Sequence, residues 1–164
     1  MTDPKPVWRA AEITATGFAF QHPLDPSSKC TMAPVSRMAG MKDVAVNVVT
    51  IAPGEQAFPY HTHHGEEEWM YIVSGAASVR LGDETHTMAD GDFVAFYKSG
   101  PSHCVRNIGT SELVCLMGGH IVSAKVIDMP ELDKRVTWTD AGVHEAPLSA
   151  FRQFAPPSPP KGEA

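Results

Sequence analysis

The stretch that decides the fold and the chemistry spans residues 54–75 and reads GEQAFPYHTHHGEEEWMYIVSG. It holds two histidines two positions apart, His61 and His63, and a carboxylate, Glu68, five positions after the second. On a β-strand, residues i and i+2 point to the same face, so both imidazoles can reach one ion while Thr62 faces away. Imidazole and carboxylate are ligands of borderline divalent metals, and the stretch therefore predicts a metal site.

Outward from this stretch, the sequence shows short strand-like segments separated by turns. The β-branched run 44–51 predicts a buried strand. We expect further strands at residues 68–73, 76–81, 84–88, 93–97, 103–107, 112–117 and 120–126, weaker ones at 7–9 and 18–20, and a helical turn at 130–135. Such regular spacing with Gly-Asp and Asp-Gly turns predicts an all-β sandwich or barrel.

Composition excludes several classes of protein. The chain has 164 residues, 43% of them hydrophobic, which suffices for one domain with a real core. A net charge of −6 without a basic cluster argues against a nucleic-acid partner. No apolar run approaches the roughly 20 residues of a membrane span, and residues 1–6 lack the apolar segment of a signal peptide. We therefore expect a cytoplasmic protein, and three cysteines without a pairing pattern agree with this.

A second stretch, residues 91–107, reads GDFVAFYKSGPSHCVRN and supplies another histidine, His103. With it, the chain resembles the cupin superfamily. The residues that match the first cupin motif are Gly54, His61, His63, Glu68 and Gly75, and those that match the end of the second are Gly100, His103 and Asn107. The second motif departs from the family pattern at Lys98, where a proline is usual, so the loop before His103 is altered.

The resemblance implies a single-domain cupin jelly-roll β-barrel with one divalent metal ion, Fe, Mn, Zn or Ni. Carried over to this chain, the implied ligands are His61, His63, Glu68 and His103. Four protein ligands leave open positions on an octahedral ion, which is typical of a catalytic metal site rather than a closed structural one. The resemblance also implies a homodimer that pairs through β-sheets.

The resemblance covers the middle of the chain and sets the expected boundaries. We expect an N-terminal extension at 1–43, the barrel core at 44–127, a C-terminal extension that packs on the barrel at 128–154, and a disordered proline-rich tail at 155–164. No internal repeat is visible, which favours one barrel over a duplicated pair.

Several side chains around the expected site have open roles. Tyr97 and Lys98 lie at the expected mouth of the barrel and, with Tyr60, are candidates for contacting an anionic substrate; an exposed loop is the alternative for them. The histidine and the two glutamates at residues 64, 66 and 67 are interpreted as a solvated loop next to the site; the alternative is that one of them supports a metal ligand or serves as a ligand itself. The residues expected to line an apolar cavity are Phe58, Met70, Ile72, Val105 and the strand at 93–97.

The leading functional hypothesis is a metal-dependent enzyme that acts on a small molecule in the barrel cavity. Within that class we favour a mononuclear oxygenase, an oxidoreductase, because a site of three histidines and one glutamate suits redox metals as well as zinc. The alternatives are a metal-dependent isomerase, lyase or decarboxylase, and a non-enzymatic cupin that binds a sugar or another small molecule. The complete ligand set favours an enzyme, since binding alone does not need four metal ligands.

Overall fold

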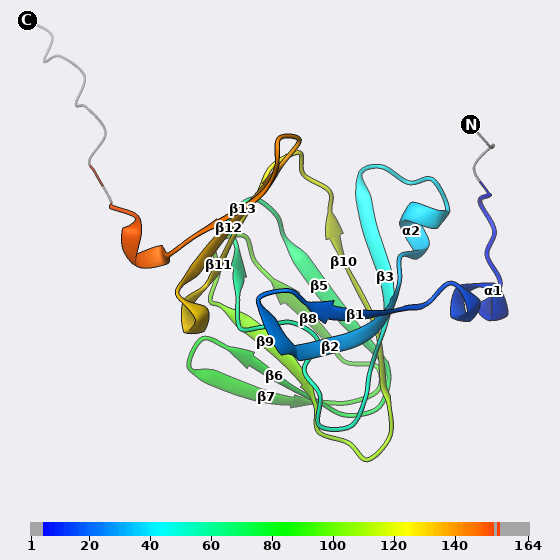
Figure 1. The fold of residues 1–164 in the computed structure, drawn as a ribbon. Coiled ribbons are helices and arrows are strands. Elements are labelled where there is room, and N and C mark those ends of the chain that lie inside the picture. Colours follow the sequence, from blue (N-terminus) through cyan, green and yellow to red (C-terminus); the bar gives the residue numbers. More distant parts are fainter. Residues whose placement is uncertain (1–4, 153, 155–164) are drawn as a thin grey trace, which may run out of the picture.

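The computed structural model describes residues 5–152 and 154, and Figure 1 shows their arrangement. In chain order the elements are α1 (Ala10–Ala15), β1 (Phe18–His22), β2 (Asp25–Ala33), α2 (Val35–Met38), β3 (Val44–Ile51), β4 (Thr62–His63), β5 (Glu68–Ser74), β6 (Ala77–Leu81), β7 (Glu84–Met88), β8 (Phe93–Phe96), β9 (His103–Asn107), β10 (Leu113–His120), β11 (Lys125–Met129), the 3-10 turn η1 (Pro130–Leu132), β12 (Lys134–Thr139), β13 (Gly142–Ala146) and the 3-10 turn η2 (Leu148–Ala150).

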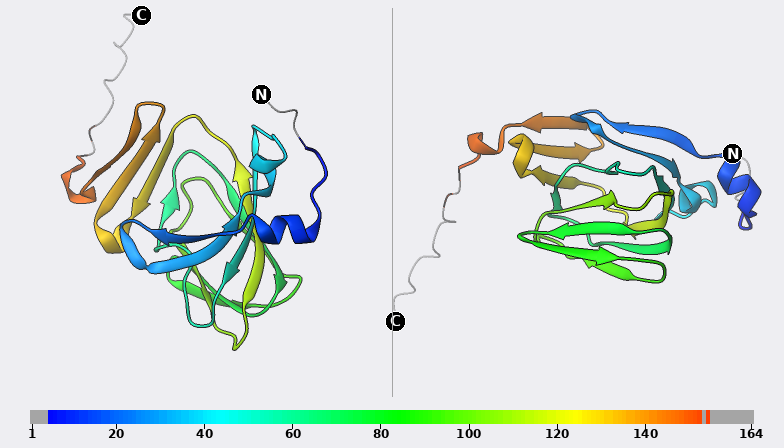
Figure 2. Two further views of the ribbon diagram at one scale, coloured as in Figure 1. Left: turned by 45° about the vertical axis from the view of Figure 1, so that its right-hand side comes forward. Right: turned by 90° about the horizontal axis from the view of Figure 1, so that it is seen from below.

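The strands form three antiparallel sheets that wrap around one interior. The sheets have the orders β1-β2-β3-β10-β5-β8, β13-β12-β11-β4 and β7-β6-β9. Figure 2 shows the green strands β6, β7 and β9 as one layer, with the blue strands β1 and β2 on the opposite side. The expected all-β class and jelly-roll architecture are confirmed.

Alternation along β5 explains how the same strand serves both the core and the site. Met70 and Ile72 are fully buried, whereas Tyr71 and Val73 are exposed on the outer face. Glu68 lies two positions before Met70 and therefore shares its inward face. The interior of the barrel is thus apolar at the far end of β5 and carries a carboxylate at the near end, where the strand begins.

A glycine allows two strands to approach closely beside the core. Gly75 has φ of 107°, and a Cβ there would lie 2.9 Å from the Cα of Leu113. Any other residue would be strained in that conformation and would push β10 away from the turn after β5. Gly75 therefore lets the turn after β5 pack directly against the start of β10, next to the buried core.

Most strand predictions in the middle of the chain agree with the structure, but two are wrong. Residues 7–9 are not a strand and lead instead into α1. The strand expected at 120–126 begins only at Lys125, because His120 still belongs to β10, where it pairs with Val44. The expected helical turn is present in short form as η1.

The segments on either side of the expected core also contribute strands. β2 pairs with β3, and β1 pairs with β2, so residues 18–33 extend the largest sheet. Towards the C-terminus, β11 pairs with both β4 and β12, which places the C-terminal strands beside His63. The proline-rich tail expected at 155–164 lies outside the described residues.

Candidate metal centre

Backbone pairing brings two of the sequence-predicted ligands side by side. His61 and His103 face each other in an antiparallel bridge and exchange both backbone hydrogen bonds, at 3.0 and 2.7 Å. In such a pair the two side chains leave the backbone on the same side of the sheet. His63 follows on β4, which pairs with β11, and Glu68 reaches in from the first position of β5. Three separate elements thus converge on one point.

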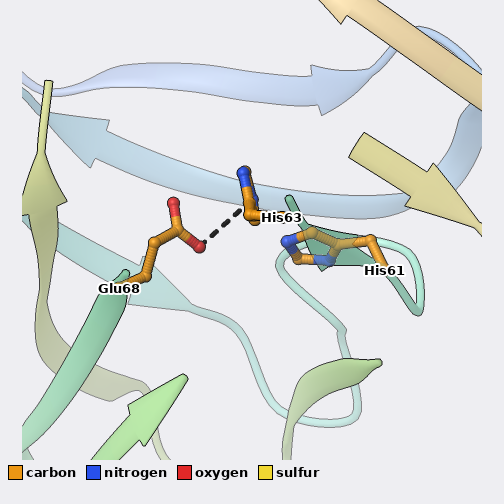
Figure 3. A group of neighbouring side chains, drawn as sticks. All are labelled: His61, His63 and Glu68. Carbon is orange, nitrogen blue, oxygen red and sulfur yellow. Dashed lines mark ion pairs between the residues drawn. The ribbon is translucent and has the colours of Figure 1, made fainter. Parts of the chain in front are cut away.

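The four side chains form a compact group, three of which Figure 3 shows. The ligand atoms of His61, His63 and Glu68 all lie within 4.8 Å of one another. Glu68 Oε2 lies 3.2 Å from His63 Nε2 and 3.9 Å from His103 Nε2. The imidazole of His103 also stacks against Phe96, with ring centroids 3.9 Å apart and planes 8° from parallel. His103 therefore adjoins the three-residue cluster as a fourth member with a fixed ring plane.

Contacts behind the cluster restrict which histidine nitrogens face its centre. His61 Nδ1 lies 2.7 Å from the carbonyl oxygen of Pro59, and His63 Nδ1 lies 2.6 Å from Glu66 Oε1. The bond to Pro59 places the proton of His61 on Nδ1, which leaves the Nε2 lone pair of His61 free. Nε2 of His63 faces an oxygen acceptor, Glu68 Oε2, at 3.2 Å. A divalent cation satisfies such facing lone pairs, so these residues fit a metal ion.

Burial keeps His61 and His103 in the form that binds metal. His61 and His63 are each 8% exposed. Burial, with neighbouring His103 and His63, lowers the pKa of His61 well below its usual value. Burial, reinforced by His63, lowers the pKa of His103 to about 4. Burial raises the pKa of Glu68, an effect that His63 partly offsets. His61 and His103 are therefore neutral imidazoles at neutral pH, with their lone pairs available.

Glu66 corrects the expectation that residues 64–67 form a solvated loop. Its side chain is 2% exposed and contacts His63 on one side and Lys125 Nζ, at 2.7 and 2.8 Å, on the other. Burial alone would raise the pKa of Glu66, but the hydrogen bonds with His63 and Lys125 outweigh it and lower the pKa. Neighbouring Glu67 is exposed, as expected. The local signal for Glu66 was only its position three residues after His63.

A cavity of about 290 Å³ opens beside the cluster. As expected, Phe58 and Val105 line it, and Phe96 contributes from the strand at 93–97. Met70 and Ile72 do not line it, because they are packed in the apolar core. The lining residues that the sequence analysis did not name are mostly apolar and include Phe20, Met32, Met117, Met129 and Trp138. Several come from the N- and C-terminal strands, whose patterns alone do not indicate a cavity.

The three candidate substrate-contacting side chains do not line this cavity. Tyr97 is 67% exposed and Lys98 is also exposed. Tyr60 donates its hydroxyl to the carbonyl of Gly82 at 3.2 Å, and the guanidinium of Arg80 lies over its ring at 3.9 Å. The structure thus brings the four candidate ligands together and places the three candidate contact residues elsewhere. Asn107, fully buried, shapes a turn by hydrogen bonds to residues 51, 109 and 111.

Comparisons with known proteins agree with the fold. A sequence model described as a cupin domain matches residues 47–119. A putative sugar phosphate isomerase from Acidithiobacillus ferrooxidans has a similar structure, with 28% identity and a TM-score of 0.88 over 93% of this chain and 98% of that chain. No curated protein matches the chain in sequence.

Two further solved structures share the fold. One is a sugar phosphate isomerase from a cupin superfamily of Silicibacter pomeroyi, at 19% identity and a TM-score of 0.74 over 85% of this chain and 90% of that chain. The other is a predicted oxalate decarboxylase from Thermotoga maritima, at 23% identity and a TM-score of 0.59 over 71% of this chain and 99% of that chain. At such identities the similarity concerns the fold alone. Among the described residues, no helix has the length and apolar character needed to cross a membrane.

Proposed function

Because this chain is a small cupin-domain protein, we propose that it is a metal-dependent enzyme that acts on a small molecule in the barrel cavity. The observation that carries the proposal is the position of the buried cluster. His61, His63, His103 and Glu68 direct acceptor atoms towards one another, and all four line the cavity. A structural metal site would be closed by its protein ligands, whereas this one adjoins a space that a substrate can enter.

In this proposal the four side chains hold one divalent ion, Fe, Mn, Zn or Ni. The bound metal would act as a Lewis acid or, if redox-active, bring dioxygen and substrate together. Imidazoles bind a metal through a lone pair and add no charge, so three of them, one carboxylate and a divalent ion would give the site one positive charge. The apolar wall excludes water and so strengthens the attraction between that charge and an anionic substrate group.

The cavity wall favours a substrate with a chelating polar end and an apolar body. Phe20, Met32, Phe58 and Met117 surround the space next to the cluster. A molecule such as a catechol or a diketone would direct its two oxygens to the metal and bury its remaining surface against these side chains. This combination supports the mononuclear oxygenase, with dioxygen as the oxidant, as the leading reaction class.

A metal-dependent isomerase is the second candidate, and one observation favours it. The putative sugar phosphate isomerase from Acidithiobacillus ferrooxidans matches this chain over nearly its whole length. A sugar phosphate, however, needs cationic partners for its phosphate group. Lys125 is the only lysine or arginine among the described residues that line the cavity, and it already forms an ion pair with Glu66. The chemistry of the wall therefore ranks this candidate below the oxygenase.

The test combines metal analysis with turnover. Protein purified without a chelating tag should contain close to one metal ion per chain, and His61→Ala with His103→Ala should remove it. Oxygen uptake with catechols or diketones, lost in that variant, would support the oxygenase. Aldose–ketose conversion without oxygen uptake would support the isomerase instead. If the metal-loaded protein binds ligands without turnover, the non-enzymatic binding protein becomes the better account. Absence of metal after reconstitution would refute the metal site.

We further propose a homodimer that pairs through the outer face of the largest sheet. Val48, Leu116, Tyr71 and Phe93 lie in one cross-strand row over β3, β10, β5 and β8. Tyr71 is 40% and Phe93 59% exposed, which is unusual for a row of apolar side chains in solution. Light scattering should give twice the mass of the chain for the native protein and the monomer mass for Tyr71→Glu. A monomeric native protein would refute the pairing.

A further inference from the structure

We propose that Glu66 is a positioning residue for the metal ligand His63, and that Lys125 holds Glu66 in place for this task. The inference rests on the proposed metal site. It concerns a buried carboxylate that the metal cluster itself leaves unused. It also selects one residue of a segment that the sequence favoured as a solvated loop.

The contacts of Glu66 are specific to one ring nitrogen. Its Oε1 lies 2.6 Å from His63 Nδ1 and 2.8 Å from Lys125 Nζ, and its Oε2 lies 2.7 Å from the same ammonium. The opposite nitrogen of His63 faces Glu68. This contact restrains the rotation of the imidazole, and a proton on Nδ1 facing the carboxylate keeps the Nε2 lone pair directed to the metal ligands. A carboxylate behind a ligand histidine also makes that histidine a better donor.

A purely structural ion pair explains these contacts less well. Lys125 lies at the start of β11, two positions before Ile127, which pairs with His63. An ion pair between the loop and this strand could form at the surface, where it costs little. Here the carboxylate is 2% exposed, and burying such a charge is expensive even when it is paired. A role in holding the predicted ligand His63 would explain why this charge is buried.

The proposal predicts how the ring behaves when Glu66 changes. Glu66→Gln keeps the size of the side chain but removes its charge. The amide can present either NH₂ or oxygen to Nδ1, so His63 is no longer held in one tautomer. In the fraction of molecules where Nε2 carries the proton, His63 cannot bind metal, and the average affinity falls.

The experiment measures metal binding alone, so it does not depend on a known substrate. Apo protein, prepared with a chelator, is titrated with Co²⁺ while its visible absorption is followed. Glu66→Gln should bind Co²⁺ about 10- to 100-fold more weakly than the native chain, the range typical for partners of metal-bound histidines. The matched control is Glu67→Gln, which makes the same change at the exposed neighbour and should stay within about twofold. Native-like affinity in a folded Glu66→Gln variant would overturn the proposal.

Two additional measurements separate positioning from folding. A structural role would lower the melting temperature of the apo protein and leave the Co²⁺ affinity intact, which would also overturn the proposal. Long-range ¹H–¹⁵N spectra of apo protein should show the Nδ1–H tautomer of His63 in the native chain and a mixture in the variant. If Glu66→Gln fails to fold, Lys125→Met tests the same idea, because it frees Glu66 to turn away and should weaken Co²⁺ binding several-fold. A native chain that binds no Co²⁺ would refute the metal site and this inference together, whereas unchanged affinity in the variants refutes the inference alone.

Discussion

His63 and His64 are consecutive residues, and each contacts a carboxylate that a cation also binds, yet their surroundings differ. His63 points into the barrel, where it meets Glu66 and approaches Glu68. His64 points to the outer side, where its Nε2 lies 2.8 Å from Asp128 Oδ2. Alternation along an extended chain is sufficient to send the two rings to opposite faces. The same pair of functional groups therefore acts in two environments, one buried beside a cavity and one partly buried on the outer side of the sheet.

The outer group acts as a connection between strands. Arg135 on β12 binds both carboxylate oxygens of Asp128 on β11, at 2.6 and 2.7 Å, and His64 Nδ1 lies 3.4 Å from Ser99 Oγ. This group of His64, Asp128 and Arg135 thereby links the loop after β4 to the two C-terminal strands β11 and β12. The comparison teaches that a histidine–carboxylate–cation group has no fixed role, and that its distance from the cavity decides what it does.

Substitution of each histidine by glutamine in turn should give the largest difference in metal affinity. His63→Gln removes a proposed ligand and should weaken Co²⁺ binding about 100- to 1,000-fold, because each ligand carries a share of the large binding free energy. His64→Gln should remain within about twofold of the native affinity. Isothermal titration of both apo variants measures this contrast. Equal losses in the two variants would break the comparison.

The pH dependence of stability should be steepest for the inner histidines. The pKa of His103 in the folded protein is about 4, below its usual 6.5. Between these pH values the unfolded chain binds a proton at His103 that the folded chain does not bind. Stability of the apo protein should therefore rise with pH between about 4 and 6.5, and His103 should contribute about 3 kcal/mol to that rise. Urea unfolding at several pH values measures it. His103→Leu should flatten the dependence of unfolding free energy on pH in this window. An unchanged slope would contradict the lowered pKa of His103.

Removal of the outer carboxylate should lower stability without affecting the metal. Asp128→Asn weakens the hydrogen bonds to Arg135 and His64 and should cost about 1–3 kcal/mol in the free energy of unfolding. The bond with Arg135 lowers the pKa of Asp128, so its stabilisation is complete above the usual aspartate pKa near 3.8 and is lost as the pH falls below it. Urea unfolding at pH 7 and Co²⁺ titration of the same variant check both parts. A large loss of metal affinity would mean that the two groups are coupled.

The smallest effects are expected at the exposed turn between β8 and β9. Tyr97→Ala and Lys98→Ala should each change the free energy of unfolding by less than about 0.5 kcal/mol and leave Co²⁺ binding unchanged. Thermal melting of apo and metal-loaded protein tests this. An altered affinity for a chelating substrate would return these side chains to the list of candidates for substrate contact.

The sequence predicted the features that depend on neighbouring residues. The alternation of β5 and the His-x-His spacing at 61 and 63 are local, and the structure places these side chains together. The turn at Asn107 is local as well. The tautomer of His61 was not predictable, because it depends on the path of the chain at Pro59.

The features that were missed depend on contacts between distant parts of the chain. Glu66 is buried because Lys125, 59 positions later, comes to meet it. Phe20 and Trp138 line the cavity because β1 is joined to β3 through β2, and β12 to β4 through β11, and neither segment has a pattern that indicates this. The direction of Tyr97 is set by the following turn, where Ser99 has φ of 53° and donates its N–H to the carbonyl of His63 at 2.8 Å.

The parallel contact between Phe96 and His103 has a spectroscopic consequence. An imidazole 3.9 Å above the centre of a benzene ring lies in the region that the ring current shields. The carbon-bound protons of His103 should therefore resonate upfield of those from the other seven of the eight histidines. This offset gives a resolved proton NMR signal from inside the cluster. Titration with diamagnetic Zn²⁺ would shift that signal directly, which makes the protein its own reporter of site occupancy.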